Sequence, residues 1–134
     1  MPTATFWQGV TQFNQQQFYA CHDTFEELWM EAELRDRAFY QGLLQIAVGC
    51  YHLSNLNWRG AVTLLGEGIG RLEEYEPTYF QIDVTQLLDQ SSALLESLQD
   101  IGEENIEAWV NSIQAPSLPT IITVQGENYD SETE

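Results

Sequence analysis

The stretch that decides the fold is 37-RAFYQGLLQIAVGCYHL-53. Its apolar residues have helical spacing and cover most of the circumference of a helix. A helix with so little polar surface is surrounded by other helices. We therefore expect a helix from about residue 36 to 53, with Asp36 as its N-cap, at the centre of a helical bundle.

Helical spacing continues on both sides of this stretch. A helix at about 15–33 precedes it, and a shorter helix before that uses Phe6, Val10 and Phe13. A helix at about 58–75 follows, and it contains several glycines. Each glycine costs roughly 1 kcal/mol of helix propensity, which indicates close approach to a neighbouring helix. These glycines are Gly60, Gly66, Gly68 and Gly70.

The second half of the chain is also helical in pattern. Pro77 ends the preceding helix, and 77-PTYFQI-82 is a connecting loop. Asp83 with Gln86 three residues later resembles a capping box, which marks the start of the next amphipathic helix. A short last helix follows and ends at Pro116. Its apolar residues are Ile106, Trp109, Val110 and Ile113.

The fold predicted from this pattern is all-α, a single-domain bundle of five to six helices with a central hydrophobic third helix. The bundle domain covers residues 1–116, and residues 117–134 form an extended acidic C-terminal tail. Within the tail, 118-LPTIITV-124 is rich in β-prone residues, which suits the addition of a strand to another chain.

The charge of the chain disfavours several classes of partner. Its 134 residues include 21 acidic side chains and 4 basic ones, for a formal net charge of -17. Such a surface repels nucleic acid and anionic lipid. Its two cysteines are not in a zinc-binding or CxxC spacing, and no apolar run is long enough to span a membrane. We expect a cytoplasmic protein without nucleic acid or membrane partners.

Polar residues on two helices predict a site. His22 and Glu26 are four residues apart and project from one face of the second helix. On the third helix, a narrow polar seam is formed by residues that lie within about 80° of one another on a helical wheel. They are Arg37, Gln41, Gln45 and His52. In an antiparallel hairpin, facing residues have numbers that sum to about 71, which brings the two sets together. The ligand-binding candidates are His22, Glu26, Trp29, Arg37, Gln41, Gln45 and His52.

The residues at this site leave three functions open. The first is a pocket for an undefined small polar ligand; in an enzyme, His22 or Glu26 would be the general base and Arg37 would anchor an anion. The second is a structural or interaction protein, in which a buried hydrogen-bond network includes an Arg37–Glu26 pair and a protein partner or homo-oligomer forms at the surface. The third is a metal-dependent hydrolase, with a divalent metal ion held by His22, Glu26 and His52.

Three ordered blocks resemble one family. They are 13-FNQQQFYACHDTFEELW-29, 37-RAFYQGLLQIAVGCYHL-53 and 57-NWRGAVTLLGEGIGRLEEY-75. The HxxxExxW spacing and the glutamines and histidine that follow resemble domain-of-unknown-function family 309, found in bacteria and archaea. Asp23 departs from the pattern, because many relatives carry glutamate there. The resemblance implies an all-helical bundle and no established activity.

Overall fold

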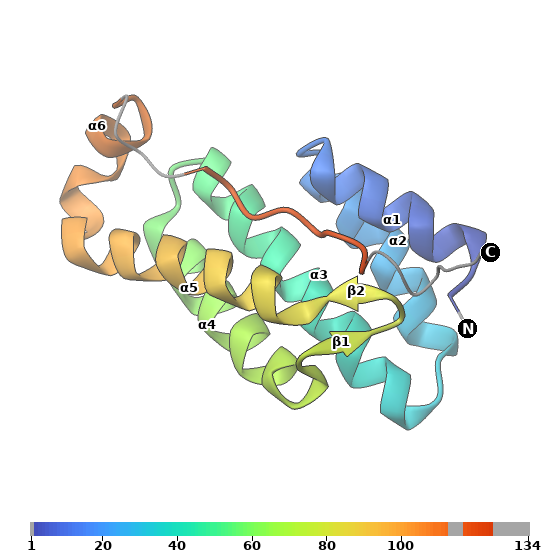
Figure 1. Ribbon diagram of the computed structural model, residues 1–134. Coiled ribbons are helices and arrows are strands. Elements are labelled where there is room, and N and C mark those ends of the chain that lie inside the picture. Colours follow the sequence, from blue (N-terminus) through green and yellow to red (C-terminus); the bar gives the residue numbers. More distant parts are fainter. Residues whose placement is uncertain (1, 113–116, 125–134) are drawn as a thin grey trace.

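A computed structural model describes residues 2–112 and 117–124 of the chain. This part of the chain contains six α-helices and a small β-hairpin, so the predicted all-α bundle is confirmed (Figure 1). The helices are α1 (Ala4–Asn14), α2 (Phe18–Glu31), α3 (Leu34–Ser54), α4 (Trp58–Leu72), α5 (Val84–Ile101) and α6 (Ile106–Val110). Between them lie the 3₁₀ turns η1 (Glu73–Tyr75) and η2 (Glu103–Asn105) and the strands β1 (Thr78–Tyr79) and β2 (Ile82–Asp83).

Helix α3 is the centre of the bundle, as the sequence predicts. It lies between α1 and α2 on one side and α4 and α5 on the other (Figure 1), and it packs directly against α2 and α4. Phe39, Leu43 and Ile46 on this helix are fully buried. Burial of each such side chain contributes about 1.5–3 kcal/mol, which explains why the most apolar helix has neighbours on both sides.

Close contact between α3 and α4 depends on glycine. A Cβ added to Gly68 would lie 2.9 Å from the carbonyl oxygen of Gly42, and one added to Gly60 would lie 2.7 Å from Cδ2 of His52. The prediction of close approach is therefore right at Gly60 and Gly68. It is wrong at Gly66 and Gly70, where an added Cβ meets no atom within 4 Å.

The caps of α3 and α5 differ in how well the sequence predicts them. Helix α3 begins earlier than expected, with Glu33 at the N-cap position, and the prediction that Asp36 is the cap is wrong. Asp36 lies in the first turn, where its Oδ1 accepts a 2.5 Å hydrogen bond from the Tyr79 hydroxyl. The Asp83 cap of α5 is confirmed, because its carboxylate accepts a hydrogen bond from the backbone N–H of Gln86.

The predicted loop 77–82 contains a tight hairpin. Thr78 pairs with Asp83 and Tyr79 with Ile82. The two residues of the turn, Phe80 and Gln81, have φ angles of 51° and 66°. Positive φ at both positions is the geometry of a type I′ turn, whose twist matches that of the strands it connects.

Residues 117–124 form an extended segment, which we call the C-terminal strap. It crosses the bundle between α5 and α1 and reaches β2 (Figure 1). Thr123 forms a β-bridge with Ile82, so the β-prone run pairs within the chain. Asn14 binds both backbone groups of Ile121, accepting from its N–H at 2.7 Å and donating to its carbonyl at 2.9 Å. Gln90 accepts from the Thr120 N–H.

Two predictions concern residues outside the described part of the chain. They are the end of the last helix, with Ile113 and Pro116, and the end of the acidic tail from residue 125.

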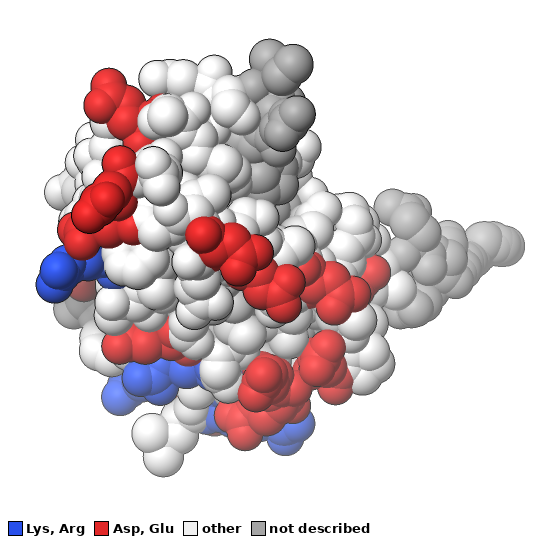
Figure 2. Space-filling view, turned by 90° about the vertical axis from the view of Figure 1, so that its left-hand side faces the viewer, with Lys and Arg blue, Asp and Glu red and all other residues white. Residues whose placement is uncertain are grey.

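The surface carries the charge expected from the composition. Figure 2 shows one face, on which carboxylates are spread widely and arginines are few. None of the helices in the described part of the chain is long and apolar enough to cross a membrane.

Candidate functional site

The residues predicted to form one seam lie in three separate places. The reason is that α3 has α2 on one side and α4 on the other, and its polar residues divide between these two contacts. The arithmetic of a hairpin gives the level of each residue along the helix axis, but it does not give the side of α3 on which the residue projects.

The first place is a cleft between α2 and α3, which we call the histidine cleft. It has a volume of about 140 Å³ and includes both predicted histidines. Its lining residues are Phe18, Tyr19, His22, Val48, Tyr51 and His52. The rings of Tyr19 and Tyr51 lie 5.5 Å apart, one from each helix. The His22 side chain is 27% exposed, so the cleft opens to solvent.

Neighbouring side chains fix the hydrogen-bonding roles of the two imidazoles. Asn57 accepts from the backbone N–H of Gly60 through Oδ1, so its Nδ2 is the atom that faces Nδ1 of His52 at 3.3 Å. Nδ1 of neutral His52 is therefore an acceptor, and its proton is on Nε2. In contrast, Nδ1 of His22 faces Oδ1 of Asp23 at 3.3 Å and must donate. This leaves Nε2 of neutral His22 as an acceptor and Nε2 of His52 as a donor.

A group of possible metal ligands lies beside the cleft. The ligand atoms of His22, Asp23 and Glu26 all lie within 4.8 Å of one another. Asp23 and Glu26 are exposed, and His22 is half-buried. His52 is not a member of this group, so the predicted metal ligand set of His22, Glu26 and His52 is not assembled in the described chain, and Asp23 takes the place of His52.

The second place is the contact between Trp29 and Arg37, near the turn that joins α2 to α3. The Arg37 guanidinium lies 5.4 Å from the centre of the Trp29 ring, and its Nη2 donates to the Ala32 carbonyl at 3.4 Å. The predicted ion pair of Arg37 with Glu26 is absent from the described residues, and Glu26 is exposed. Trp29 Nε1 and Arg37 Nε are buried without a hydrogen-bond partner among these residues.

The third place is between α3 and α4. Gln45 is buried and projects toward α4, where its Oε1 accepts from Arg71 Nε at 3.0 Å and its Nε2 donates to Glu67 at 3.2 Å. This side chain is therefore a structural link between two helices. Gln41 is half-buried and makes no side-chain hydrogen bond within the described chain.

Four residues of the cleft were not among the predicted site residues. They are Phe18, Tyr19, Val48 and Tyr51. The hairpin arithmetic already contained the signal for two of them, because 19 and 51 sum to nearly the value expected for facing residues. Neither tyrosine was predicted to take part in the site, and Tyr19 is 61% exposed.

A family model matches part of the chain. The sequence model of the family described as Domain of unknown function (DUF309) matches residues 6–64. This range includes every predicted site residue and the whole histidine cleft. No curated protein and no solved structure matches the chain.

Proposed function

We propose that the chain, whose residues 6–64 match the DUF309 family model, binds a small ring-shaped ligand with a polar edge in the histidine cleft. The observation that carries the proposal is that two imidazoles line one cleft among aromatic rings, with a carboxylate beside Nδ1 of one and an amide beside Nδ1 of the other. We place this binding in the cytoplasm, because Cys21 and Cys50 are free thiols, as is usual in a reducing compartment.

The size of the cleft limits the ligand. An apolar protein cavity of about 150 Å³ accommodates one benzene molecule. The histidine cleft, at about 140 Å³, is of this size. It is smaller than the roughly 300–1,000 Å³ typical of pockets for drug-sized molecules. A single six-membered ring, free or at the end of a larger molecule, is therefore the fitting occupant.

The chemistry of the cleft limits the ligand further. The rings of Tyr19 and Tyr51 offer surfaces for stacking. We infer that the Nε2 atoms of His22 and His52 face the cleft and offer one acceptor and one donor, which pair with a ligand edge that carries an N–H beside a carbonyl. Cyclic amides have such an edge.

The proposal is tested with 2-pyridone, which has this edge, and benzene, which lacks it. Since the chain has 2 histidines, labelling with histidine that carries ¹³C only at Cε1 gives one ring signal for each in NMR spectra. We expect 2-pyridone to shift both signals saturably, with a dissociation constant in the millimolar range, about −4 kcal/mol. In His22→Phe, 2-pyridone should bind no more tightly than benzene. Binding of benzene to this variant would show that the cleft is intact. If neither probe gives a saturable shift, the proposal is wrong.

A second candidate is a divalent metal site at His22, Asp23 and Glu26. The observation that favours it is the approach of their ligand atoms to within 4.8 Å of one another. One imidazole nitrogen and two carboxylate oxygens suit Zn²⁺ or Mn²⁺. Three protein ligands leave a coordination position open for water, which is the basis of the metal-dependent hydrolase hypothesis.

Equilibrium dialysis against Zn²⁺ or Mn²⁺, followed by elemental analysis, tests this candidate. We expect one bound ion per chain and its loss in His22→Ala. Glu27→Gln is the matched control, because Glu27 is also exposed on α2 but lies outside the group. Absence of bound metal in the unchanged protein, or equal binding by His22→Ala, would exclude the site.

A further inference from the structure

Arg35 differs from the other arginines in its partners. The chain has 4 basic residues, all arginine. Arg59 pairs with Glu103, Arg71 donates to Gln45, and Arg37 donates to a backbone carbonyl. The Arg35 guanidinium has no hydrogen bond or ion pair within the described chain, and it lies over the Tyr79 ring at 6.0 Å from the ring centre. In a chain with a net charge of -17, an unpaired guanidinium is unexpected.

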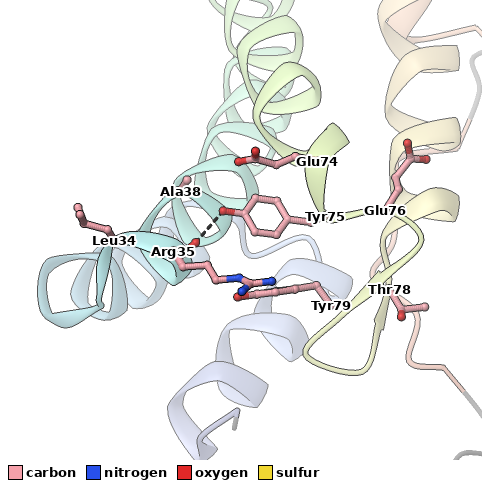
Figure 3. A pocket seen from close by; sticks show the side chains of 8 residues that line it. All are labelled: Leu34, Arg35, Ala38, Glu74, Tyr75, Glu76, Thr78 and Tyr79. Atoms are coloured by element: carbon pink, nitrogen blue, oxygen red, sulfur yellow. Dashed lines mark hydrogen bonds between the residues drawn. The ribbon is translucent and has the colours of Figure 1, made fainter.

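Arg35 lines a cavity that is separate from the histidine cleft. The cavity has a volume of about 510 Å³, within the range of small-molecule pockets. It lies between the start of α3 and the segment that contains η1 and β1 (Figure 3). Its lining residues are Leu34, Arg35, Ala38, Glu74, Tyr75, Glu76, Thr78 and Tyr79.

Two tyrosine rings form fixed walls of this cavity. The Tyr75 hydroxyl donates to the backbone carbonyl of Arg35 at 2.7 Å, and the Tyr79 hydroxyl donates to Asp36 at 2.5 Å. Both hydroxyls are thus used within the protein, and the two rings pack edge to face with their centres 4.7 Å apart. Because these rings are already held in place, little side-chain entropy is lost when a ligand contacts them.

The charges of the cavity have opposite signs and are separated. In Figure 3 the Arg35 guanidinium lies beside Tyr79, the ring of Tyr75 stands between it and the carboxylate of Glu74, and Glu76 lies apart, to the right of both. Consistent with this separation, neither glutamate forms an ion pair with Arg35. The cavity therefore offers a bidentate donor for a carboxylate at one side and acceptors for an ammonium group at the other.

We propose that this cavity binds a small zwitterion, an amino acid whose ammonium and carboxylate groups are separated by a short carbon chain. The carboxylate binds Arg35, the ammonium group binds Glu74 or Glu76, and the carbon chain lies against the tyrosine rings. A simple anion is disfavoured because the net charge of the protein repels it. A simple cation leaves Arg35 unpaired beside it. A zwitterion has no net charge to be repelled and satisfies both sides.

The test uses matched probes that differ only in their charged groups. The zwitterion 6-aminohexanoate is compared with hexanoate, which lacks the ammonium group, and with hexylamine, which lacks the carboxylate. Glycine and 4-aminobutanoate vary the separation between the two charges. Binding is followed through the NMR signals of Tyr75 and Tyr79 in the full chain. We expect saturable binding of 6-aminohexanoate or 4-aminobutanoate, at least tenfold tighter than binding of hexanoate or hexylamine.

Arg35→Gln and Arg59→Gln form a matched pair of variants. Both arginines are exposed, and each substitution removes one positive charge, so their effects on the net charge of the protein are equal. Arg59, at the start of α4, does not line the cavity. We expect Arg35→Gln to weaken binding of the zwitterion at least tenfold and Arg59→Gln to change it less than twofold. Equal effects of the two variants, equal binding of charged and zwitterionic probes, or no saturable shift with any zwitterion would each overturn the proposal.

Discussion

For Asp36, the sequence correctly predicts a position near the start of a helix but predicts the wrong interaction for its side chain. Its position before an apolar helix favours an N-cap, yet its carboxylate binds the hydroxyl of Tyr79, which is 43 residues away along the chain. The cap preference is a local property of aspartate, whereas the contact with Tyr79 depends on how η1 and β1 fold back onto α3. A contact of this kind leaves no pattern in the sequence near Asp36.

The contact with Asp36 affects the titration of Tyr79. Burial, and next the hydrogen bond to Asp36, raise the pKa of Tyr79 to about 12. The folded protein thus favours the neutral phenol, and the stability from this preference is present below pH 10 and lost as the pH rises toward 12. In Asp36→Asn the charged acceptor is gone, so the pKa of Tyr79 should fall toward its ordinary value.

NMR titration of the Tyr79 ring carbon that bears the hydroxyl measures this change. Asp89→Asn is the control, because Asp89 is an exposed carboxylate on α5. An unchanged Tyr79 titration in Asp36→Asn would contradict the assigned role of the hydrogen bond.

The two cysteines should be unreactive in the folded protein. Burial raises the pKa of the Cys50 thiol to about 12, and burial together with the neighbouring Cys50 raises the pKa of Cys21. The thiolate is the reactive form, and both residues are buried. At pH 8 we expect Ellman's reagent to label neither thiol in the native state and both in urea. Rapid labelling of the native protein would show that one of these thiols reaches solvent.

At the scale of helices and strands, periodicity predicts most of the fold. The predicted helices at about 15–33, 36–53 and 58–75 correspond to α2, α3 and α4 with the 3₁₀ turn that follows it, because their apolar stripes are long and regular. The hairpin in 78–83 was not predicted, since its turn is Phe80–Gln81 and lacks the Asn-Gly or Asp-Gly pair that identifies a type I′ turn. For the candidate site, the sequence predicts which residues lie level with one another on α2 and α3, but the side of α3 on which Gln45 projects depends on the packing of α4.

The glycines of α4 give opposite predictions for the same substitution. Gly68→Ala places a methyl group 2.9 Å from the carbonyl oxygen of Gly42, which is backbone and cannot rotate away. We expect it to lower the free energy of unfolding by about 1–3 kcal/mol. Gly70→Ala meets no atom within 4 Å and should raise the free energy of unfolding by up to about 1 kcal/mol through helix propensity. Urea denaturation of both variants checks this, and changes of the same sign would contradict it.

At the scale of the whole molecule, the C-terminal strap connects elements that are distant in sequence. It binds Asn14 at the end of α1, Gln90 on α5 and the strand β2. Most of its polar contacts involve backbone groups, and a pattern of side chains does not specify them. The sequence therefore predicts an extended segment at 118–124 but does not predict where it docks.

Removal of the Asn14 side chain should release the strap. In Asn14→Ala the N–H and carbonyl of the buried Ile121 lose their partners, at a cost of about 1–3 kcal/mol for each unsatisfied group. We expect faster hydrogen exchange at the amide of Ile121, with little change in the centre of α3. Thr11→Ala, an exposed position on the same helix, is the control. Unchanged exchange at Ile121 in Asn14→Ala would show that the other contacts of the strap hold it without Asn14.

The strap also has a consequence for the order of folding. Its bond from Asn14 to Ile121 closes a loop of 107 residues, whereas α2 and α3 meet through a turn of two residues. Closing so long a loop has a large entropic cost, which only a preformed docking surface offsets. The hairpin of α2 and α3 can form as soon as both helices are made, but the strap has no binding site until α1, α5 and β2 are in place. We therefore expect substitutions in the strap to speed unfolding and to leave the rate of folding almost unchanged.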